Sequence, residues 1–554
     1  MPPSPAPTEP CPEGQSAAGA PGWPPRDGRH LLVSGAQMAA LEQRLFASGL
    51  PVEALMEKAG LALSRALLRD HGSALERHGA VVLVGPGHNG GDGLVVAREL
   101  HLAGLAVAIW SPFESHKPLT ANHLRHATWL GIPQLQAPPD PAAPALWIDA
   151  LLGIGQRRPP DGGLQELLQA RARHCPGRLV AIDVPTGLCA DSGRCLGASA
   201  ARAVHTYTLA LVKTGLVQDS ALGWVGRLEL IQLGLTPALL RHLPADQPLG
   251  ISGADLAGAP WPALDPAAAK YGRGRLLVVA GSERFRGAAA LALAGASAAG
   301  CGSLRAALPE SLAETLWSIH PHVVVSRPLA CDGQGHLALA QLGAAELARL
   351  DGLLVGPGLG AGRAAAADEA GAEGGVDGEA TDEAAAWWRL QAFPGLLVLD
   401  ADGLNRLAGL GGGDWLRQRC GPTWITPHRG EFDRLFPNLR GMEALAAAAA
   451  AARCSGAAVL LKGARSVVAA PDGRRWQLLE AAPAAARAGL GDVLAGYAAA
   501  VGTMAMATGS QPTAALLAAA ALAHAGAGLQ LQQQGPGRAS PEAVAHCLET
   551  GPTG

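Results

Sequence analysis

Several parts of this sequence place polar residues where chemistry is possible. The stretch Val84–Gly93 (VGPGHNGGDG) follows an apolar run and precedes a helical pattern. A glycine-rich loop in that position exposes backbone N–H groups at the start of a helix, where they stabilise an anion. Asp149 and Asp183 each end an apolar run that leads into a glycine-containing turn. Because ligands of open α/β sheets bind beyond the carboxyl ends of the strands, both aspartates are candidate ligand-binding residues.

The same residues also have structural interpretations. The glycine-rich stretch could be a tight turn with Asp92 as a helix cap, and Asp149 and Asp183 could start turns by accepting from nearby amides. For the glycine-rich loop the two interpretations stay equally open, whereas a ligand site is favoured for Asp149 and Asp183. Asn89, Asp149 and Thr186 together offer hard oxygen ligands of low total charge. That set suits a monovalent cation better than zinc.

The clearest chemical pattern of the second half is Ala488–Gly496 (AGLGDVLAG), which opens a long run without charged residues. Free amides near Gly491 could bind a transferring phosphoryl group, while Asp492 could accept the proton of an attacking hydroxyl. As a plain helix cap, Asp492 would be worth about 1 kcal/mol. The GxGD spacing favours the catalytic interpretation.

Composition sets the class of protein. The chain has 554 residues, several times a domain of about 150 residues, so we expect two or more hydrophobic cores. Hydrophobic residues make up 49% and charged residues 16%, which excludes a disordered protein and a coiled coil. The 43 basic and 46 acidic residues nearly balance, so the charge composition does not indicate a nucleic-acid-binding protein.

The nine cysteines without a CxxC pair predict a reduced, cytoplasmic protein. Lysine occurs at only five positions, which marks these as places that require a compact ammonium group.

Alternating strand and helix patterns predict an α/β protein with two domains. Helical spacing over residues 31–50 and 51–70 opens the first series of elements. The expected segments are a disordered tail over 1–30, a first domain over 31–235, a linker over 236–268, a second domain over 269–550, and an acidic loop insertion over 363–385. The charge-free segment Val493–Gly537 is rich in Ala and Gly and contains Pro512, which predicts a buried helical hairpin and no membrane span.

The first domain resembles the NAD(P)H-hydrate epimerase family in a set of short motifs. These are Met56–Gly60, Asn89–Gly93, Asp149–Gly155, Asp183–Gly187 and Lys213–Gly215. The resemblance implies a Rossmann-like, three-layer α/β/α domain that interconverts the R and S epimers of hydrated NADH or NADPH, with potassium in the site.

This resemblance also implies roles for individual residues. Asp183 would be the acid/base, and potassium would be bound by Asn89, Asp149 and Thr186. The dinucleotide would contact Asn89, Gly90, Gly91, Asp92, Gly93, Gly153, Ile154, Gly155, Gln156, Arg157 and Asp183. The sequence departs from the family at His88, where Asn is usual, and at Cys189, where Asp is common. Neither departure removes a proposed catalytic group.

The second domain resembles the NAD(P)H-hydrate dehydratases of the ribokinase-like superfamily. The motifs are the GxGD element ending at Asp492, Thr426–Glu431 and Lys462-Gly463, within residues 260–550. The family phosphorylates the hydroxyl of the S hydrate with ADP in bacteria or ATP in eukaryotes, then loses phosphate to restore the dihydronicotinamide.

The dehydratase resemblance assigns Asp492 as the base. The hydrate would contact Ala288, Gly360, His428 and Asp492, and the nucleotide would contact Lys462, Gly463, Ala464, Arg465, Ser466 and Gly491. Magnesium would neutralise the phosphates. Leu490 stands where the family usually has Thr or Ser, so we expect weakened activity.

The sequence therefore predicts a bifunctional enzyme that repairs hydrated NAD(P)H, with ADP giving AMP and phosphate. In one alternative, the second domain is a ribokinase-type small-molecule kinase, for example of a vitamin. In another, the first domain is a non-catalytic nucleotide-binding module. The expected partners are the small-molecule substrates and further copies of the chain in a homo-oligomer, with neither nucleic acid nor membrane.

Overall fold

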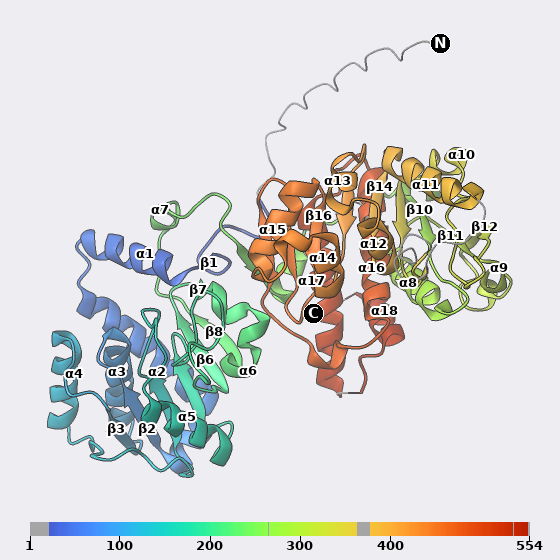
Figure 1. Ribbon diagram of the computed structural model, residues 1–554. Coiled ribbons are helices and arrows are strands. Elements are labelled where there is room, and N and C mark those ends of the chain that lie inside the picture. Colours follow the sequence, from blue (N-terminus) through green and yellow to red (C-terminus); the bar gives the residue numbers. More distant parts are fainter. Residues whose placement is uncertain (1–21, 264, 363–376, 536, 552–554) are drawn as a thin grey trace.

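A computed structural model describes residues 22–263, 265–362, 377–535 and 537–551. It contains two α/β domains side by side, the first blue to green and the second yellow to red in Figure 1. Each is built on its own sheet, with helices packed on both faces. The expected two-domain α/β architecture is confirmed.

The first domain has a six-stranded sheet whose strands are all parallel. In spatial order the strands are β3 (Val107–Trp110), β2 (Ala80–Val84), β4 (Leu146–Ala150), β5 (Leu179–Ile182), β6 (His205–Leu209) and β8 (Arg227–Ile231). The chain runs from β2 outward to β3 and then returns to β4, so the strand order reverses between β2 and β4. Such a reversal opens a crevice at the carboxyl ends of the strands, where ligands of open sheets bind.

Helices cover the two faces of this sheet, and alternate strand residues pack against each layer. Val82 and Ile148 belong to the core under the first four helices, whereas Leu83 and Trp147 belong to the core under α5. The helices of the domain are α1 (Gly35–Ala47), α2 (Val52–His78), α3 (His88–Leu102), α4 (Pro118–Trp129), α5 (Gly162–His174) and the short α6 (Leu222–Val225). A small parallel pair, β1 (Leu32–Val33) with β7 (Val212–Lys213), lies apart from the main sheet.

The second domain has a ten-stranded, mostly parallel sheet in which β16, β17 and β18 pair antiparallel. In spatial order its strands are β12 (Val324–Leu329), β11 (Ser303–Pro309), β10 (Arg275–Val279), β13 (Gly352–Val355), β14 (Leu396–Leu399), β15 (Thr423–Ile425), β16 (Ala458–Leu461), β17 (Val467–Ala469), β18 (Arg475–Leu478) and β9 (Leu249–Ile251). Here the strand order reverses between β10 and β13.

Two helical layers enclose this second sheet. One layer holds α8 (Arg286–Ala299), α16 (Leu490–Ala507), α17 (Ala514–Gln534) and α18 (Pro541–Thr550). The other holds α11 (Asp377–Ala392), α12 (Ala401–Ala408), α13 (Gly412–Arg417), α14 (Arg429–Leu435) and α15 (Ala444–Ser455). The short helices α9 (Glu310–Ala313) and α10 (Ala344–Leu347) lie near the β12 edge (Figure 1).

The predicted apolar hairpin corresponds to α16 and α17. Both helices are long and apolar enough to cross a membrane, but 78% of the α16 window and 67% of the α17 window are buried inside the protein. They pack against α8, α18 and the sheet as core helices.

The structure differs from the predicted tail at residues 22–30, which are folded. The indole of Trp23 donates to the backbone oxygen of Asp255 at 2.9 Å, and the indole of Trp476 donates to that of Trp23 at 2.9 Å. His30 bridges the carboxylates of Asp27 and Asp255. Residues 1–21 lie outside the described residues. The tail expected over 1–30 is therefore too long.

Residues 236–268, predicted as a linker, also contain regular structure. α7 (Pro237–Leu240) lies there, and β9 pairs parallel with β18 as the last strand of the second sheet. In the predicted acidic insertion, residues 363–376 lie outside the described residues. The remainder belongs to α11, where the carboxylate of Glu383 accepts from Arg406 at 3.1 Å and from the amide of Leu339 at 3.0 Å.

Helices α8 and α16 cross at two glycines. A Cβ at Gly295 would lie 2.0 Å from the backbone oxygen of Val493, and a Cβ at Gly496 would lie 1.9 Å from that of Ala292. Both distances are too short for a methyl group, so only glycine permits this crossing. The crossing lies within a turn of Asp492 and therefore helps to fix the start of α16.

Replacing Gly496 with Ala is expected to destabilise the second domain by about 1–3 kcal/mol, because the added methyl group overpacks the crossing. Urea unfolding followed by far-UV circular dichroism measures the loss. The control is Gly526→Ala in α17, where the added Cβ would meet only the Cδ1 atom of Leu256 at 3.8 Å. Equal stability of the two variants would contradict the prediction.

Candidate active sites

The loop between β2 and α3 forms one wall of the first site. α3 begins at His88, with Gly87 as N-cap and without a side-chain cap. A Cβ at Gly90 would lie 2.1 Å from the backbone oxygen of Gly85, so this tight loop requires glycine. The first turn of α3 therefore offers backbone amides to a ligand, as an anion-binding loop does.

Asp183 follows β5 directly and forms a buried ion pair. Its φ of 66° is left-handed, which is costly for a residue with a side chain and is typical of functional sites. Its Oδ1 atom accepts from Lys213 Nζ at 2.5 Å and from the amide of Leu209 at 3.2 Å. Lys213 is 1% exposed and also donates to the Leu209 carbonyl at 2.7 Å. This ammonium group occupies one of the five lysine positions of the chain.

Asp183 affects the pKa of two further carboxyl groups, Asp92 and Glu42. Asp92 is the fifth residue of α3 and is therefore not the helix cap. Burial, then the charges of Asp183 and Glu42, raise the pKa of Asp92 well above its usual range. Burial and the charge of Asp183 also raise the pKa of Glu42, on α1. The site thus places two carboxyl groups with raised pKa values near the Asp183–Lys213 pair. Glu42 was not predicted, since it lies on an amphipathic helix with no motif around it.

The predicted potassium ligands surround the loop after β4. Asp149 is fully buried, and its carboxylate accepts from the Thr186 amide and the Thr186 hydroxyl, each at 2.8 Å. Burial raises the pKa of Asp149 to about 6. The amide nitrogen of Asn89 is buried and has no hydrogen-bond partner among the described residues. A Cβ at Gly153 would lie 3.4 Å from Asn89 and 3.6 Å from Asp183. Asp149 and Thr186 are buried and Asn89 is half-buried, and a set of carboxylate, hydroxyl and amide oxygens of this kind fits a cation of low charge.

The remaining predicted epimerase residues lie on the loop between β4 and α5. Gln156 donates to the Pro185 carbonyl at 3.2 Å and accepts from the Gly187 amide at 2.7 Å, so it braces the turn that follows Asp183. Gly155 and Arg157 are exposed, and the rest of this loop is half-buried: Gly153, Ile154 and Gln156.

Asp492 is the third residue of α16 and lies among buried charges. The N-cap is Gly489, and no side-chain capping bond forms, so Asp492 does not act as the predicted alternative cap. Burial, followed by the charge of Asp400, raises the pKa of Asp492 to about 7, although Lys462 opposes the shift. A carboxyl group with a pKa near neutral is suited to general-base catalysis.

Lys462 lies between Asp400, one of the acidic groups around Asp492, and the turn at Gly491. Its Nζ atom donates to Asp400 at 2.6 Å, and Asp400 also accepts from the Thr426 hydroxyl at 2.9 Å. Burial lowers the pKa of Lys462, but the charges of Asp400 and Glu431 more than offset it, so the pKa is raised. A Cβ at Gly491 would lie 3.4 Å from Nζ. A permanent ammonium group thus lies beside the predicted anion-binding turn.

His428 caps α14 with its own ring. Nδ1 accepts from the amides of Gly430 at 2.9 Å and Glu431 at 3.3 Å, which places the ring proton on Nε2. Nε2 lies 3.2 Å from the Glu431 carboxylate, and 55% of the side chain is exposed. The ring is therefore held at the open side of the site.

The other predicted hydrate contacts lie at the neighbouring strand ends. The amide of Gly360 donates to Asp402 Oδ2 at 2.8 Å. Ala288 lies in the first turn of α8 against the loop at Gly358, where an added Cβ would be 2.7 Å from Ala288 Cβ. Asp402 also raises the pKa of Asp492, so the structure links these loops to the catalytic candidate.

The loop Gly463–Ser466, predicted to bind the nucleotide, contacts the first domain. The amides of Ala464 and Arg465 donate to the carboxylate of Asp219 at 3.0 and 2.9 Å. The Ser466 hydroxyl and the backbone of Gly463 hydrogen-bond to each other. Contact of this loop with a nucleotide stays a prediction.

The departures from the family pattern have simple environments. Leu490 is 4% exposed and belongs to the core of the second domain, so its side chain does not line the anion-binding turn. His88 is exposed at the start of α3. Cys189 is free, as are the other cysteines of the described residues.

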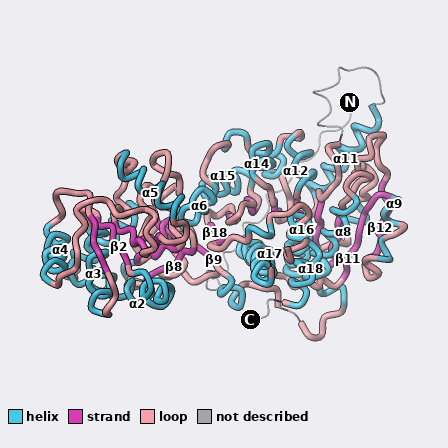
Figure 2. The backbone as a smooth tube through the Cα atoms, turned by 90° about the horizontal axis from the view of Figure 1, so that it is seen from below, coloured by secondary structure: helices cyan, strands magenta, loops and turns pink. Residues whose placement is uncertain are grey.

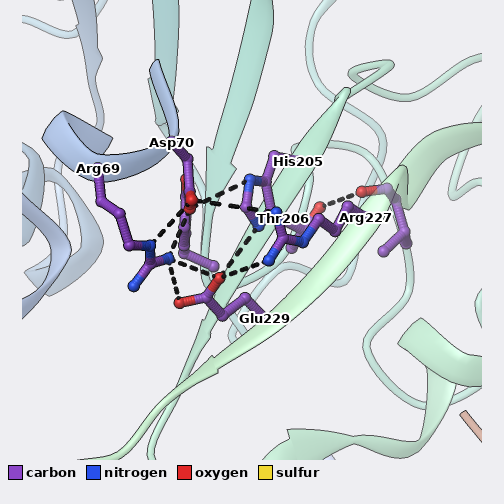
Figure 3. Close-up of polar contacts among 8 residues, drawn as sticks. Arg69, Asp70, His205, Thr206, Arg227 and Glu229 are labelled. Carbon is purple, nitrogen blue, oxygen red and sulfur yellow. Dashed lines mark hydrogen bonds and ion pairs between the residues drawn. The ribbon is translucent and has the colours of Figure 1, made fainter. Parts of the chain in front are cut away.

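A third polar cluster lies at the β8 edge of the first sheet, between α2, β6 and β8 (Figure 3). Asp70, His205 and Glu229 place ligand atoms within 4.8 Å of one another. The Arg69 guanidinium, however, already donates to both carboxylates at 2.6–2.9 Å, and Arg227 lies 3.6 Å from Glu229. Burial, then the charge of Arg227, lowers the pKa of His205 to about 4. Two carboxylates facing two guanidiniums form a balanced ion network that ties α2 to the sheet.

Replacing Glu229 with Gln is expected to lower the free energy of unfolding of the first domain by about 1 kcal/mol at low salt, since Arg69 loses one of its two partners. The loss should shrink at high ionic strength, because the Arg69 side chain is half-exposed and its charge is screened. Thermal unfolding at two salt concentrations tests this, with Glu76→Gln, an exposed site on the same helix, as the control. A salt-independent loss would contradict the network.

Comparison with known proteins also separates the chain into two parts, one for each sheet. Residues 52–215 match the family described as YjeF-related protein N-terminus, and residues 276–547 match the family described as NAD(P)H-hydrate dehydratase. A bifunctional NAD(P)H-hydrate repair enzyme Nnr from Gloeobacter violaceus is 42% identical over 473 residues, covering 84% of this chain and 87% of the relative. The namesake from Synechocystis is 38% identical and covers 91% of both chains. A solved ADP/ATP-dependent NAD(P)H-hydrate dehydratase from Bacillus subtilis is 23% identical, with a TM-score of 0.41, over 54% of this chain and 95% of its own.

The fold and its two sites define a two-domain α/β enzyme with a buried carboxylate–lysine pair in each domain. The chain belongs to the family of bifunctional NAD(P)H-hydrate repair enzymes, which joins an epimerase domain to a dehydratase domain. Both resemblances drawn from the sequence are confirmed, and neither alternative is favoured.

Proposed function

We propose that the first domain interconverts the R and S epimers of hydrated NADH and NADPH, and that the second dehydrates the S epimer with ADP. The observation that carries the proposal is the presence in one chain of two buried carboxylate–ammonium centres, Asp183 with Lys213 and Asp400 with Lys462 beside Asp492. An enzyme that consumes one epimer recovers all of a damaged cofactor only when the other epimer is converted to it.

In the first site, Asp183 would act as the acid/base of the epimerisation, and Lys213 would fix the carboxylate in place. The amides at the start of α3 would hold the phosphates of the dinucleotide. Asn89, Asp149 and Thr186 would hold potassium, which would supply a positive charge near the substrate. The burial of Asp149 and Thr186, with Asn89 half-buried, supports this assignment.

In the second site, Asp492 would accept the proton of the substrate hydroxyl as that oxygen attacks the terminal phosphorus of ADP, with AMP as the leaving group. The phosphate ester would then lose phosphate and restore the dihydronicotinamide. Lys462 and the amides near Gly491 would stabilise the transferring phosphoryl group. Magnesium, when bound with the nucleotide, would neutralise phosphate charge.

The test is the absorbance at 340 nm of a mixed-epimer NADPH-hydrate solution with the wild-type protein, ADP and Mg²⁺. Full recovery of NADPH at early times, with one phosphate released per NADPH, is the expected result. An accumulating phosphate ester without NADPH would instead indicate a small-molecule kinase. No recovery with either ADP or ATP would refute the dehydratase function.

Assembly and location complete the proposal. We expect a cytoplasmic homo-oligomer, and light scattering of the purified chain tests the oligomeric part.

A further inference from the structure

Asp219 carries a contact between the two domains that the proposed chemistry does not use. It opens a short 3₁₀ turn, Asp219–Ala221, next to α6 in the first domain. Its two carboxylate oxygens accept from consecutive backbone amides of the second domain, Oδ2 from Ala464 at 3.0 Å and Oδ1 from Arg465 at 2.9 Å. A Cβ at Gly463 would lie 2.6 Å from Oδ2, so glycine at that position permits the approach. Figure 2 shows α6 beside α15, β18 and β9 at this junction.

The same loop is tied to the first domain at a second point. Arg465 is 7% exposed, and its guanidinium donates to the Leu216 carbonyl at 2.9 Å. Within the second domain, the side-chain amide of Gln477 on β18 donates to the Arg465 carbonyl at 2.9 Å. Three bonds to residues 216–219 thus hold the backbone and side chain of the loop from one side.

The held loop forms one wall of a cleft between the domains. The cleft has a volume of about 290 Å³, and its lining includes Lys462, Gly463 and Arg465 from the second domain with Arg194 and Asp219 from the first. Lys462 belongs also to the proposed phosphoryl-transfer site, so the cleft and that site share a side chain. Arg194 pairs with Glu443 of the same lining at 2.8 Å, and Lys462 pairs with Asp400 at 2.6 Å, so neighbouring carboxylates hold these two cationic groups in place.

We propose that Asp219 is a positioning residue for the nucleotide of the second domain, held by the first domain against the nucleotide loop. The inference rests on the proposed nucleotide-dependent function. A carboxylate that receives two charge-assisted hydrogen bonds fixes both amides in one conformation. A loop that is already ordered binds its ligand without the entropic cost of ordering it. The first domain therefore sets the nucleotide affinity of the second.

The experiment compares Asp219→Asn with wild type in the full-length protein, with ADP varied at saturating NADPH hydrate and Mg²⁺. The carboxamide can accept from one amide only, and its NH₂ group faces the other donor. The KM for ADP should rise about tenfold, the equivalent of a lost hydrogen bond to a charged group. The kcat should stay within about twofold, as expected when only binding is lost. Epimerisation should be unchanged, which also reports that the first domain is folded.

The matched control is Asp246→Asn. Asp246 accepts from Arg475 of the second domain at 3.0 Å, so it is another carboxylate at the domain junction, but it does not contact the loop. Its replacement should leave the KM for ADP unchanged. An equal rise in both variants would mean general loosening of the junction and would overturn the proposal.

Other results also test the positioning role of Asp219. An unchanged KM in Asp219→Asn overturns the proposal, and a lowered KM does so as well, since it means that the carboxylate competes with the nucleotide. Should Asp219→Asn fail to fold, Asp219→Glu takes its place: the extra methylene displaces the carboxylate, so a raised KM supports the positioning role and an unchanged KM refutes it. Absence of ADP-dependent recovery in wild type would refute the proposed function itself and is distinct from all of these results.

Discussion

Replacing Asp492 with Asn should lower kcat/KM for ADP-dependent recovery of NADPH by about a hundredfold to ten-thousandfold, the usual contribution of a general base. The carboxamide keeps the shape of the side chain but cannot accept the proton of the attacking hydroxyl. The assay is the absorbance at 340 nm with the S epimer, ADP and Mg²⁺. Epimerisation should continue at the wild-type rate, since Asp183 lies in the other domain.

The pH dependence of the wild-type enzyme provides a second test of Asp492. Burial and the charge of Asp400 raise the pKa of Asp492 to about 7, and only the ionised form can act as a base. The kcat/KM should therefore rise with pH through about 7 and level off above it. Asp414→Asn, an exposed aspartate on α13 of the same domain, should retain this profile. A profile that stays flat between pH 6 and 8 would contradict the assignment.

Replacing Asp183 with Asn should abolish enzymatic epimerisation, again with a loss of about a hundredfold to ten-thousandfold. Lys213 would lose its only carboxylate partner at hydrogen-bond distance among the described residues, so the site would also lose its charge balance. With a mixed-epimer sample and an intact second domain, recovery of NADPH should split into two phases. The S epimer should react at the normal rate, and the remainder at the rate of spontaneous epimerisation.

The control for this variant is Asp161→Asn. Asp161 caps α5 by accepting from the Leu164 amide at 2.8 Å, and Asn caps a helix about as well as Asp. Single-phase recovery should therefore persist in the control. Single-phase recovery in Asp183→Asn would show that another group, such as the neighbouring Asp92, carries the proton.

Local sequence patterns singled out one aspartate in each candidate site but not all of the groups around it. Asp183 and Asp492 were predictable, because a strand end and a GxGD turn are short motifs with a known geometry. Lys213 and Glu42 reach the first site from β7 and α1, and no local spacing connects them to Asp183. The scarcity of lysine was one signal, since both buried site lysines belong to that small set, and the Lys213–Gly215 and Lys462-Gly463 motifs of the two family resemblances were the other.

The same limit applies to strands whose sequences lack a continuous apolar run. β6 has the sequence HTYTL, and its buried His205, Thr206 and Thr208 do not form the apolar run that predicts a central strand. Its register is set by pairing with β5 and β8. β17 and β18 are short and antiparallel, so the parallel βα alternation did not predict them either. Trp23 appeared in a Pro- and Gly-rich region, where only its distant partners Asp255 and Trp476 show that the segment is folded.

The position of β9 limits how the protein can be divided. Since β9 precedes the second domain in the chain but closes its sheet, a fragment that starts at residue 269 would expose the whole edge of β18. An unprotected edge strand recruits strands from other molecules, so that fragment is expected to aggregate. A fragment that starts before Leu249 keeps the edge covered. A stable second domain produced on its own must therefore begin before Leu249, ahead of the boundary at residue 269 that the sequence predicts.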